Sequence, residues 1–415
     1  MNKLTLRDLD VQGKKVLMRV DFNVPVKDGV VGDDTRITAA LPSINYVLEH
    51  GGSLVLMSHC GRPKGKKNPE FSLKPAADRL AELVSAKVTL APDVIGPEVK
   101  ALVDELKAGE ILVLENVRFY AEEEGKAKLA DDATDEEKAA AKAEMKTKQD
   151  AFSKELASFG DVYVSDAFGT AHRAHASMVG VTKYIDQCAA GFLLEKEIEY
   201  LGKALESPVK PFVAIIGGAK ISGKIDVVTN FLDKCDKILI GGGMAYTFYK
   251  AQGKAIGGSL VEEDKVELAA QILKQAEEKG VEFLLPIDNT VADAFSAEAN
   301  VKVVGDSIED GWMALDIGPK TIELYCDAVA NAKTVVWNGP MGCFEMAPFA
   351  AGTFSVCEAV AKSDSISIIG GGDSVAAVNL SGVADQMSHV STGGGASLEF
   401  MEGKQLPGIV ALTDK

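Results

Sequence analysis

Four arginines in the first half of the chain stand where they could bind an anion. Arg36, Arg62, Arg118 and Arg173 each occupy a turn or loop near the end of an apolar, β-rich run. An arginine in such a place can bind a carboxylate or a phosphate through two parallel hydrogen bonds. All seven arginines of the chain lie at or before residue 173, so we expect the anion site in the first half.

Polar side chains accompany these arginines. Asp21 and Asn23 belong to the segment VDFNVP, His59 to MSHCGRP, and His172 to DAFGTAHRAH. His172 and His175 have the i, i+3 spacing of metal ligands, but no acidic residue or cysteine stands close to them in the sequence. We therefore predict a polar, cationic pocket for a small acidic metabolite and no metal ion at this histidine pair.

Glycine-rich turns dominate the second half of the chain. Four apolar or β-rich runs break directly into glycines, in IIGGAK (215–220), LIGGGMA (239–245), IIGGGDS (368–374) and VSTGGGAS (390–397). One such turn is expected wherever a strand leads tightly into a helix. Four of them favour phosphate or nucleotide binding, because a backbone without Cβ atoms can point its N–H groups at a phosphate from close range.

One of these turns nearly matches a phosphate-binding loop. The segment from Gly218 to Lys224 fits the pattern GxxxxGK, but Ile225 follows where Ser or Thr would bind magnesium. We therefore predict a metal ligand elsewhere, and Asp373, directly after a triple glycine, is the candidate. Its alternative role is to cap the helix that follows, and the two roles are compatible.

The order of apolar runs predicts the elements that position these residues. Strand-like and helix-like segments alternate along both halves, which is typical of parallel sheets covered by helices on both faces. The strand-like runs include KKVLMRVDFNV, SLVLMS, EILVLENV, DVYVSDA, PFVAIIGG, DKILIGGG, VEFLLPID, TVVWNGP and SISIIGGG. The fold class is therefore α/β, with two doubly wound, Rossmann-like parallel-sheet domains joined by a hinge helix. Ligands bind at the carboxyl ends of strands in such folds.

Changes in composition along the chain predict where these domains begin and end. We expect an N-terminal domain over 1–187, a hinge helix over 188–204 and a C-terminal domain over 205–400. Residues 121–158 are rich in Ala, Glu and Lys and predict a solvated helical insertion without a chemical role.

Composition and charge exclude several classes of protein. The net charge of −17 would repel nucleic acid and anionic membranes, so an anionic substrate must be attracted by local charge. The chain has no apolar run of 18 residues and no secretory signal at its start. Its six cysteines are scattered and form no CxxC pair, which indicates reduced thiols and a cytoplasmic location.

Taken together in their order, these motifs resemble those of the phosphoglycerate kinases. The resemblance runs from about residue 5 to the C-terminus, through VDFNVP, SHCGRP, LENVRF, DAFGTAHRAH, GGAKISGKI, GGGMA, VWNGPMGCFE, GGGDS and HVSTGGGASLE. It implies a two-domain, monomeric phosphotransferase with a carboxyl group as acceptor. Its reaction would be reversible, Mg²⁺-dependent phosphoryl transfer between 1,3-bisphosphoglycerate and ADP, giving 3-phosphoglycerate and ATP in glycolysis and gluconeogenesis. Transfer would be in line and follow hinge closure, and residues 401–415 would return to the N-terminal domain.

The resemblance also implies which residues bind each substrate. The triose would be bound by Asp21, Asn23, Arg36, His59, Arg62, Arg118 and Arg173. The nucleotide would be bound by Gly218, Ala219, Lys220, Lys224, Gly243, Ala314, Leu315, Asn338, Pro340, Glu345, Gly372, Asp373 and Ser374. Within that set, Glu345 would take the ribose hydroxyls, and Asp373 would hold the magnesium ion of MgADP or MgATP.

Phosphoryl transfer needs stabilisation of negative charge on the transferring oxygens more than it needs a base. We expect that stabilisation from Arg36, Lys220, Mg²⁺ and the backbone N–H groups of Gly371, Gly372, Gly394 and Gly395. Three residues depart from those common in the family, namely Cys60 for Leu, Ala314 for Gly and Ser374 for Thr. We expect these changes to leave the activity in place.

Three other classes of protein share parts of this pattern. An acyl-phosphate kinase similar to carbamate or acetylglutamate kinase also uses glycine-rich phosphate turns, but the seven polar candidates favour a substrate with both a carboxylate and a phosphate. A non-catalytic binding protein would leave Lys220, Lys224 and Asp373 without a purpose. A dinucleotide-dependent dehydrogenase would need a GxGxxG fingerprint, which is absent after the first strands.

Overall fold

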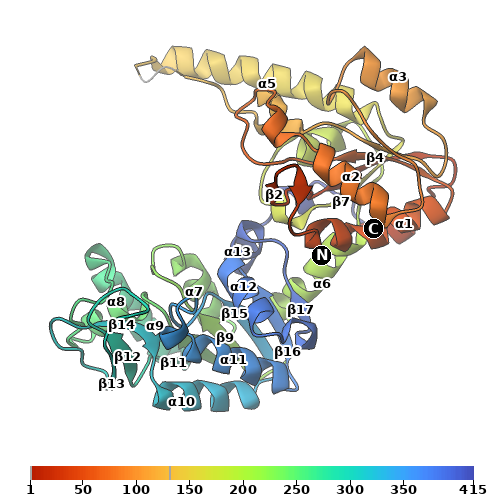
Figure 1. Cartoon of the computed structure of the whole chain (residues 1–415). Helices are drawn as coiled ribbons and strands as arrows, with labels where there is room; N and C mark the ends of the chain where they lie inside the picture. Colours follow the sequence, from red (N-terminus) through yellow and green to blue (C-terminus); the bar gives the residue numbers. More distant parts are fainter. Residues whose placement is uncertain (1, 130–131) are drawn as a thin grey trace. The chain divides into compact units, whose positions relative to one another are not determined.

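The computed structural model describes residues 2–129 and 132–415, and its chain divides into two compact units. The first unit comprises the chain up to Ile198 together with Gln405–Lys415, and the second comprises Glu199–Lys404. Each unit is built on a six-stranded sheet in which all neighbouring strands are parallel (Figure 1). The α/β class and the two parallel-sheet units predicted from the sequence are confirmed.

The sheet of the first unit has the strand order β5-β6-β4-β1-β7-β8. These strands are β1 (Lys15–Val20), β4 (Ser53–Met57), β5 (Val88–Leu90), β6 (Ile111–Val113), β7 (Val162–Asp166) and β8 (Cys188–Ala190). The helices are α1 (Thr35–Glu49), α2 (Lys74–Leu83), α3 (Pro97–Glu105), α4 (Ala121–Glu124), α5 (Asp135–Ala157) and α14 (Pro407–Val410). A small hairpin, β2 (Val26–Lys27) with β3 (Val30–Val31), precedes α1.

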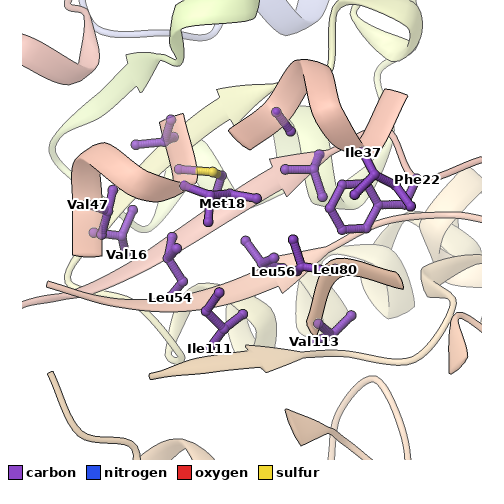
Figure 2. Close-up of a cluster of buried hydrophobic side chains, with 14 of the residues drawn as sticks. Val16, Met18, Phe22, Ile37, Val47, Leu54, Leu56, Leu80, Ile111 and Val113 are labelled. Carbon is purple, nitrogen blue, oxygen red and sulfur yellow. The ribbon is translucent and has the colours of Figure 1, made fainter. Parts of the chain in front are cut away.

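One large apolar cluster of the first unit lies on one face of its sheet, and the other face is buried as well, since Leu17 of β1 and Val55 of β4 are fully buried. Figure 2 shows Val16 and Met18 of β1 beside Leu54 and Leu56 of β4, with Leu80 of α2 packed against them. Burying a side chain of this size contributes about 1.5–3 kcal/mol, so the cluster holds the central strands firmly. Because strand side chains alternate between faces, the neighbours of Met18 in β1 point to the opposite side of the sheet.

The sheet of the second unit has the strand order β11-β10-β9-β15-β16-β17. Its strands are β9 (Phe212–Ile216), β10 (Lys237–Ile240), β11 (Glu282–Leu284), β15 (Thr334–Asn338), β16 (Ile366–Gly370) and β17 (His389–Val390). Its helices are α7 (Ile225–Leu232), α8 (Ala245–Ala251), α9 (Val266–Lys279), α10 (Pro319–Ala330), α11 (Ala351–Lys362), α12 (Gly372–Leu380) and α13 (Gly395–Met401). An antiparallel sheet of β12 (Asn289–Ala292), β13 (Val301–Val304) and β14 (Met313–Ile317) is an addition that the sequence pattern did not predict.

The helix expected at 188–204 begins later than the sequence pattern suggested. Residues 188–190 form the edge strand β8, and α6 spans Phe192–Glu206. Its start is fixed by other elements, because the Asp166 carboxylate accepts the N–H groups of Leu193 and Leu194 at 2.9 and 3.2 Å. Gly191 lies so close to this carboxylate that a Cβ atom there would approach it to 2.3 Å.

The end of the chain packs in the first unit. The N–H of Gly408 donates to the carbonyl of Ala171 at 2.8 Å, and the N–H of Thr413 donates to that of Cys188 at 2.9 Å. An ion pair of 2.7 Å joins Lys3 and Asp414. This returning segment begins at Gln405, shortly after α13 ends at Met401.

The segment expected to be a solvated insertion contains two helices, α4 and α5, and one buried charge. Most side chains of α5 are exposed, as the Ala/Glu/Lys composition predicted, whereas Glu123 of α4 is fully buried. Residues 130 and 131 of this insertion, and residue 1 of the predicted N-terminal domain, lie outside the described residues. Within the described ranges, no helix combines the length and apolar character that crossing a bilayer requires.

Candidate active site

The polar residues predicted in the first half come together at one edge of the first sheet. Strands β6, β4, β1 and β7 are neighbours and parallel, so their carboxyl ends share that edge. Asp21 directly follows β1, His59 follows β4 by two residues, Arg118 lies in the turn after β6, and Arg173 lies in the loop after β7. We call the seven predicted residues, Asp21, Asn23, Arg36, His59, Arg62, Arg118 and Arg173, the arginine cluster.

Arg36 is held at this edge by the end of β1. Its Nη1 donates to Asp21 Oδ2 at 2.9 Å and to the carbonyl of Asn23 at 3.2 Å. The Asn23 side chain accepts the N–H of Gly61 at 2.9 Å and so ties the β1 loop to the loop after β4. The Arg36 side chain remains 39% exposed, which leaves the guanidinium accessible to a ligand. Asp21 and Asn23 therefore orient Arg36 and its loop.

Arg118 is a buried cation with an unused donor. Its side chain is 5% exposed, and its Nη1 donates to the carbonyl of Gly61 at 2.8 Å. Its Nη2 has no hydrogen-bond partner within the described part of the chain, and its Nε lies 3.5 Å from Glu124 Oε1. Burial, with the nearby charges of Arg173 and Arg19, lowers the pKa of Arg118 to about 10, so it stays charged at neutral pH.

Asn116 holds the backbone around Arg118 and was not predicted. Its side-chain amide donates to the carbonyls of Cys60 and Phe71 at 2.6 and 2.9 Å, and its oxygen accepts the N–H of Arg118 at 3.0 Å. This buried amide joins the loops after β4 and β6. The motif LENVRF contains it, but a lone asparagine beside a strand end gives no signal that separates such a structural amide from a loop residue.

Two histidines of the region, His59 and His172, are neutral at pH 7. Burial lowers the pKa of His59 well below its usual value, and the charges of Arg19 and Arg118 lower it further. Burial and the Arg173 charge lower the pKa of His172 to about 4, and its Nε2 accepts from Arg173 Nε at 3.0 Å. Arg62 is exposed and Arg173 half-buried. The positive charge of the cluster therefore belongs to its arginines.

The second unit contains a cavity of about 480 Å³ bounded by three of the predicted glycine turns. Such a volume is typical of small-molecule sites. Eight predicted nucleotide residues line it, namely Gly218, Ala219, Gly243, Ala314, Leu315, Pro340, Glu345 and Asp373. The other lining residues were not predicted: Gly242, Tyr246, Gly258, Leu260, Phe295, Met313, Met341, Gly342 and Cys343. Most of these are apolar or glycine, and such residues carry no individual chemical signal in a sequence. We call this space the glycine-lined cavity.

Five predicted residues of the nucleotide set do not line the cavity. Lys220 and Gly372 are exposed and are sequence neighbours of residues that line the cavity, and Lys224 is half-buried. Burial lowers the pKa of Lys224 to about 8, although the charges of Asp373 and Glu402 oppose this shift. Asn338 and Ser374 are buried. The Ser374 hydroxyl accepts the N–H of Gly339 at 2.5 Å and so fastens the start of α12 to the turn after β15.

The glycines of these turns are of two kinds. A Cβ atom at Gly217 would lie 2.0 Å from the carbonyl oxygen of Pro340, and one at Gly339 would lie 2.1 Å from that of Gly217. These glycines let two backbones touch. At Gly218 and Gly372, by contrast, a Cβ would meet no atom within 4 Å in the described chain. The structural interpretation of the glycine turns therefore applies to Gly217 and Gly339, whereas Gly218 and Gly372 leave open space beside the backbone.

The described residues contain no group of three or more His, Cys, Asp or Glu side chains arranged to hold a metal ion. Asp373 is a single exposed carboxylate in the first turn of α12 and lines the glycine-lined cavity. One carboxylate fits a magnesium ion that arrives with the phosphates of a nucleotide, since Mg²⁺ takes most of its oxygen ligands from phosphate and water. That His172 and His175 hold no metal ion stays a prediction.

An arginine cluster at one sheet edge and a glycine-lined cavity with one carboxylate in a second α/β unit are features of a phosphotransferase for an anionic metabolite. The sequence model of the family described as phosphoglycerate kinase matches residues 6–404, and the chain belongs to this family. It carries out the family's reaction, the reversible Mg²⁺-dependent transfer of a phosphoryl group between 1,3-bisphosphoglycerate and ADP.

Relatives and solved structures agree with this assignment. The chain is 57% identical over 418 residues to phosphoglycerate kinase of Chloroherpeton thalassium, with all of both chains covered. It is 54% identical over 419 residues to that of Clostridium novyi, again over the full length of both. Its fold is similar to the phosphoglycerate kinase structure from Coxiella burnetii, with a TM-score of 0.86, 40% identity and coverage of 99% and 98% of the two chains.

Proposed function

We propose that the arginine cluster binds 3-phosphoglycerate or 1,3-bisphosphoglycerate and that the glycine-lined cavity binds MgADP or MgATP. Arg118 carries the first half of this proposal. A buried guanidinium with a donor that lacks a protein partner is costly, and a bound carboxylate or phosphate would supply the missing acceptor. Arg62 and Arg173 would add charge from the loops beside it, while Asp21 and Asn23 orient Arg36.

On the nucleotide side, the lining of the cavity supports a division of roles. Ala314 and Leu315, with the apolar side chains beside them, would flank the adenine ring, and Glu345 would accept the ribose hydroxyls. Asp373 would hold the magnesium ion, which neutralises charge on the nucleotide phosphates when bound. Lys220 and Lys224 would contact the phosphate oxygens.

The chemical step needs alignment and charge stabilisation. A carboxylate oxygen of 3-phosphoglycerate attacks the γ-phosphorus of ATP, the new carboxyl oxygen–phosphorus bond forms, and the bond to the ADP oxygen breaks. We assign stabilisation of the transferring oxygens to Arg36, Lys220 and the N–H groups of Gly371, Gly372, Gly394 and Gly395. The α12 helix begins at Gly372, so its first N–H groups point out of the helix and are available to phosphate oxygens.

Calorimetric titration of Arg118→Met with 3-phosphoglycerate tests the role of Arg118. We expect the affinity to fall by about 10- to 100-fold, the range for losing a hydrogen bond to a charged group. MgADP affinity should stay at the wild-type value, which reports that the second unit is folded, and an unchanged far-ultraviolet circular dichroism spectrum reports the fold of the whole chain. Arg79→Met is the matched control, because Arg79 is paired with Asp34 and Glu82 and does not belong to the cluster. Unchanged 3-phosphoglycerate affinity in Arg118→Met would refute the assignment.

We also propose a cytoplasmic location. All six cysteines are free thiols, and burial raises the pKa of every one of them, as expected of structural thiols in a reducing compartment. A net charge of −17 does not favour contact with nucleic acid or an anionic membrane.

The monomeric state stays a prediction, which sedimentation velocity would test.

A further inference from the structure

A buried chain of polar groups lies beneath the arginine cluster and begins at Glu123. This residue is fully buried in α4. Its Oε1 accepts the hydroxyl of Ser177 at 2.6 Å, and its Oε2 accepts the Ser177 N–H at 3.0 Å. Burial alone would raise the pKa of Glu123, but His175 at 3.5 Å, Arg19 and Ser177 together hold it below its usual value. The carboxylate is therefore charged in the folded protein.

Arg19 continues the chain from Ser177. It lies on the face of β1 opposite Met18 and is fully buried. Its Nε donates to Ser177 Oγ at 2.9 Å, its Nη1 donates to the carbonyl of Val20, and its Nη2 lies 3.2 Å from His59 Nδ1. The direction of each hydrogen bond in this chain is fixed, because a guanidinium can only donate hydrogen bonds and an ionised carboxylate can only accept them.

The same argument fixes the proton of His59. Since Arg19 has only donors, the 3.2 Å contact requires a lone pair on His59 Nδ1, and the ring proton must then sit on Nε2. Asp21 Oδ1 lies 3.9 Å from Nδ1, beyond hydrogen-bond distance. The other charged or titratable groups around His59, namely Arg118, Arg173 and His175, disfavour a second proton on the ring.

We propose that Glu123 and Ser177 are positioning residues that act through Arg19 to hold His59 neutral, with its Nε2–H ready to donate to an oxygen of bound phosphoglycerate. This proposal rests on the function proposed for the arginine cluster. Glu123 supplies the negative charge that lets Arg19 stay buried, and Ser177 connects the two side chains by hydrogen bonds. Arg19 in turn sets the tautomer and the orientation of the His59 ring. His59 then adds a directed neutral donor to a site whose charge comes from arginines.

Nitrogen NMR of the ligand-free protein tests the tautomer without any substrate. The whole chain would be labelled with ¹⁵N-histidine, and the signals of His59 among the five histidines would be assigned with His59→Gln. We expect an unprotonated Nδ1 and a protonated Nε2 that do not change between about pH 6 and pH 8. A protonated Nδ1, or titration of His59 within that range, would overturn the proposal.

Two variants test whether Glu123 and Ser177 determine the tautomer of His59. In Ser177→Ala and Glu123→Gln we expect the His59 spectrum to show a mixture of tautomers. The KM for 3-phosphoglycerate should rise by about tenfold while the KM for MgATP stays unchanged, as for the loss of one oriented hydrogen bond. Ser153→Ala is the matched control, because Ser153 is equally buried but donates to the Gln149 carbonyl of its own helix. If the His59 spectrum of Ser177→Ala is the same as that of the wild type, the proposed role of Ser177 and Glu123 is wrong.

Substitution of His59 itself separates this proposal from the function of the cluster. His59→Gln keeps a side-chain N–H donor and should retain more 3-phosphoglycerate affinity than His59→Leu, which has none. If the wild-type tautomer is as expected but His59→Leu binds 3-phosphoglycerate as tightly as wild type, the contact of His59 with substrate is wrong and the chain does not serve the reaction. The Arg118→Met titration would in that case still decide the function of the cluster by itself.

Discussion

Arginine side chains, and not His59 or His172, provide the positive charge of the arginine cluster. Arg118 keeps its proton because its lowered pKa of about 10 is still well above neutral, whereas the pKa of His172 falls to about 4. The positive charge facing a bound anion is therefore constant across the physiological pH range. Substrate affinity in that range should follow the ionisation of the substrate phosphate more than that of the protein.

Arg36→Ala should lower kcat by at least roughly 100-fold, the scale for removing a preorganised charge-stabilising donor. Arg36 is the accessible guanidinium whose orientation is fixed by Asp21 at 2.9 Å, so it can act on the transferring oxygens without reorganising first. Steady-state kinetics in the direction of ATP consumption, coupled to reductive removal of the product and followed by NADH loss, measures this.

Asp21→Asn is the companion variant for Arg36. It removes the charge that orients Arg36 but keeps a hydrogen-bond acceptor of the same shape, so its kcat should fall less than that of Arg36→Ala. If Arg36→Ala raises only the KM for 3-phosphoglycerate and leaves kcat near wild type, Arg36 binds substrate and does not stabilise the transferring group.

Polar residues that follow strands could be predicted from the sequence, whereas buried ones could not. Arg118 and His59 stand just beyond apolar runs, and parallel strands bring such positions to one edge. Arg19 sits inside an apolar strand, and Glu123 sits inside a segment that looks like a solvated helix. Nothing in either pattern shows that the two side chains share a buried hydrogen-bond chain, because Ser177, which joins them, lies 54 positions from Glu123 and 158 positions from Arg19.

At the scale of elements, the strand-to-helix turns of the second unit combine packing and ligand binding. Gly217 and Gly339 allow the turns after β9 and β15 to touch, and Ser374 fastens the start of α12 to them. Gly372 belongs to the same group of turns but has open space where a side chain would be. Substitutions at these positions should therefore have different consequences.

Gly372→Ala should weaken MgADP binding by roughly tenfold or more without changing stability, since the added methyl group would occupy space needed by a phosphate next to the α12 N-terminus. Gly217→Ala is its matched control and should lower the free energy of unfolding by about 1–3 kcal/mol, the usual cost of overpacking. Calorimetric titration and urea unfolding measure the two effects. Equal loss of stability in both variants would contradict the distinction between open and packed glycines.

The alternation of strands and helices predicted the two parallel sheets, but the boundaries of some elements depend on contacts made in space. The start of α6 is set by Asp166 and by the Ser43 hydroxyl, which accepts the N–H of Phe192 at 2.9 Å. The antiparallel sheet that contains β14 has strands of only four or five residues, each interrupted by a polar side chain, and such short runs give little signal in a sequence. β14 supplies Ala314 and Leu315 to the cavity wall, so part of the nucleotide site depended on an unpredicted element.

At the scale of the whole molecule, each unit uses a buried aspartate to start a helix. Asp166 accepts N–H groups of α6 in the first unit, and Asp316 accepts the N–H of Gly352 in α11 at 2.7 Å in the second. Burial raises the pKa of each carboxyl to about 7, although these hydrogen bonds oppose the shift. Two separately folded cores thus contain the same pH-sensitive contact.

Asp316→Asn should make the stability of the second unit less dependent on pH. In the folded unit Asp316 keeps its proton up to about pH 7, whereas the unfolded chain releases it near pH 4, so the folded form binds more protons between these values. The wild-type contribution of Asp316 to the free energy of unfolding is thus present below about pH 4 and is lost as the pH rises through about 7. Asparagine does not titrate, so Asp316→Asn removes the part of the pH dependence of the free energy of unfolding that comes from Asp316.

Tryptophan fluorescence during urea unfolding at about pH 5 and about pH 8 measures this slope. Both tryptophans, Trp312 and Trp337, lie in the second unit, so their fluorescence follows its unfolding. Asp327→Asn, at an exposed position of α10, should keep the wild-type difference between the two pH values. A difference that persists in Asp316→Asn would show that this carboxyl does not titrate as described.

The return of Gln405–Lys415 to the first unit affects the order in which a ribosome can complete the two cores. The second unit is one continuous stretch, Glu199–Lys404, whereas the first needs both ends of the polypeptide. The Thr413 N–H that meets the Cys188 carbonyl on edge strand β8, and the Lys3–Asp414 pair, cannot form until translation reaches the last residues. The unit synthesised first is therefore the last to be finished, and a nascent chain carries an incomplete first core while its second core can already close.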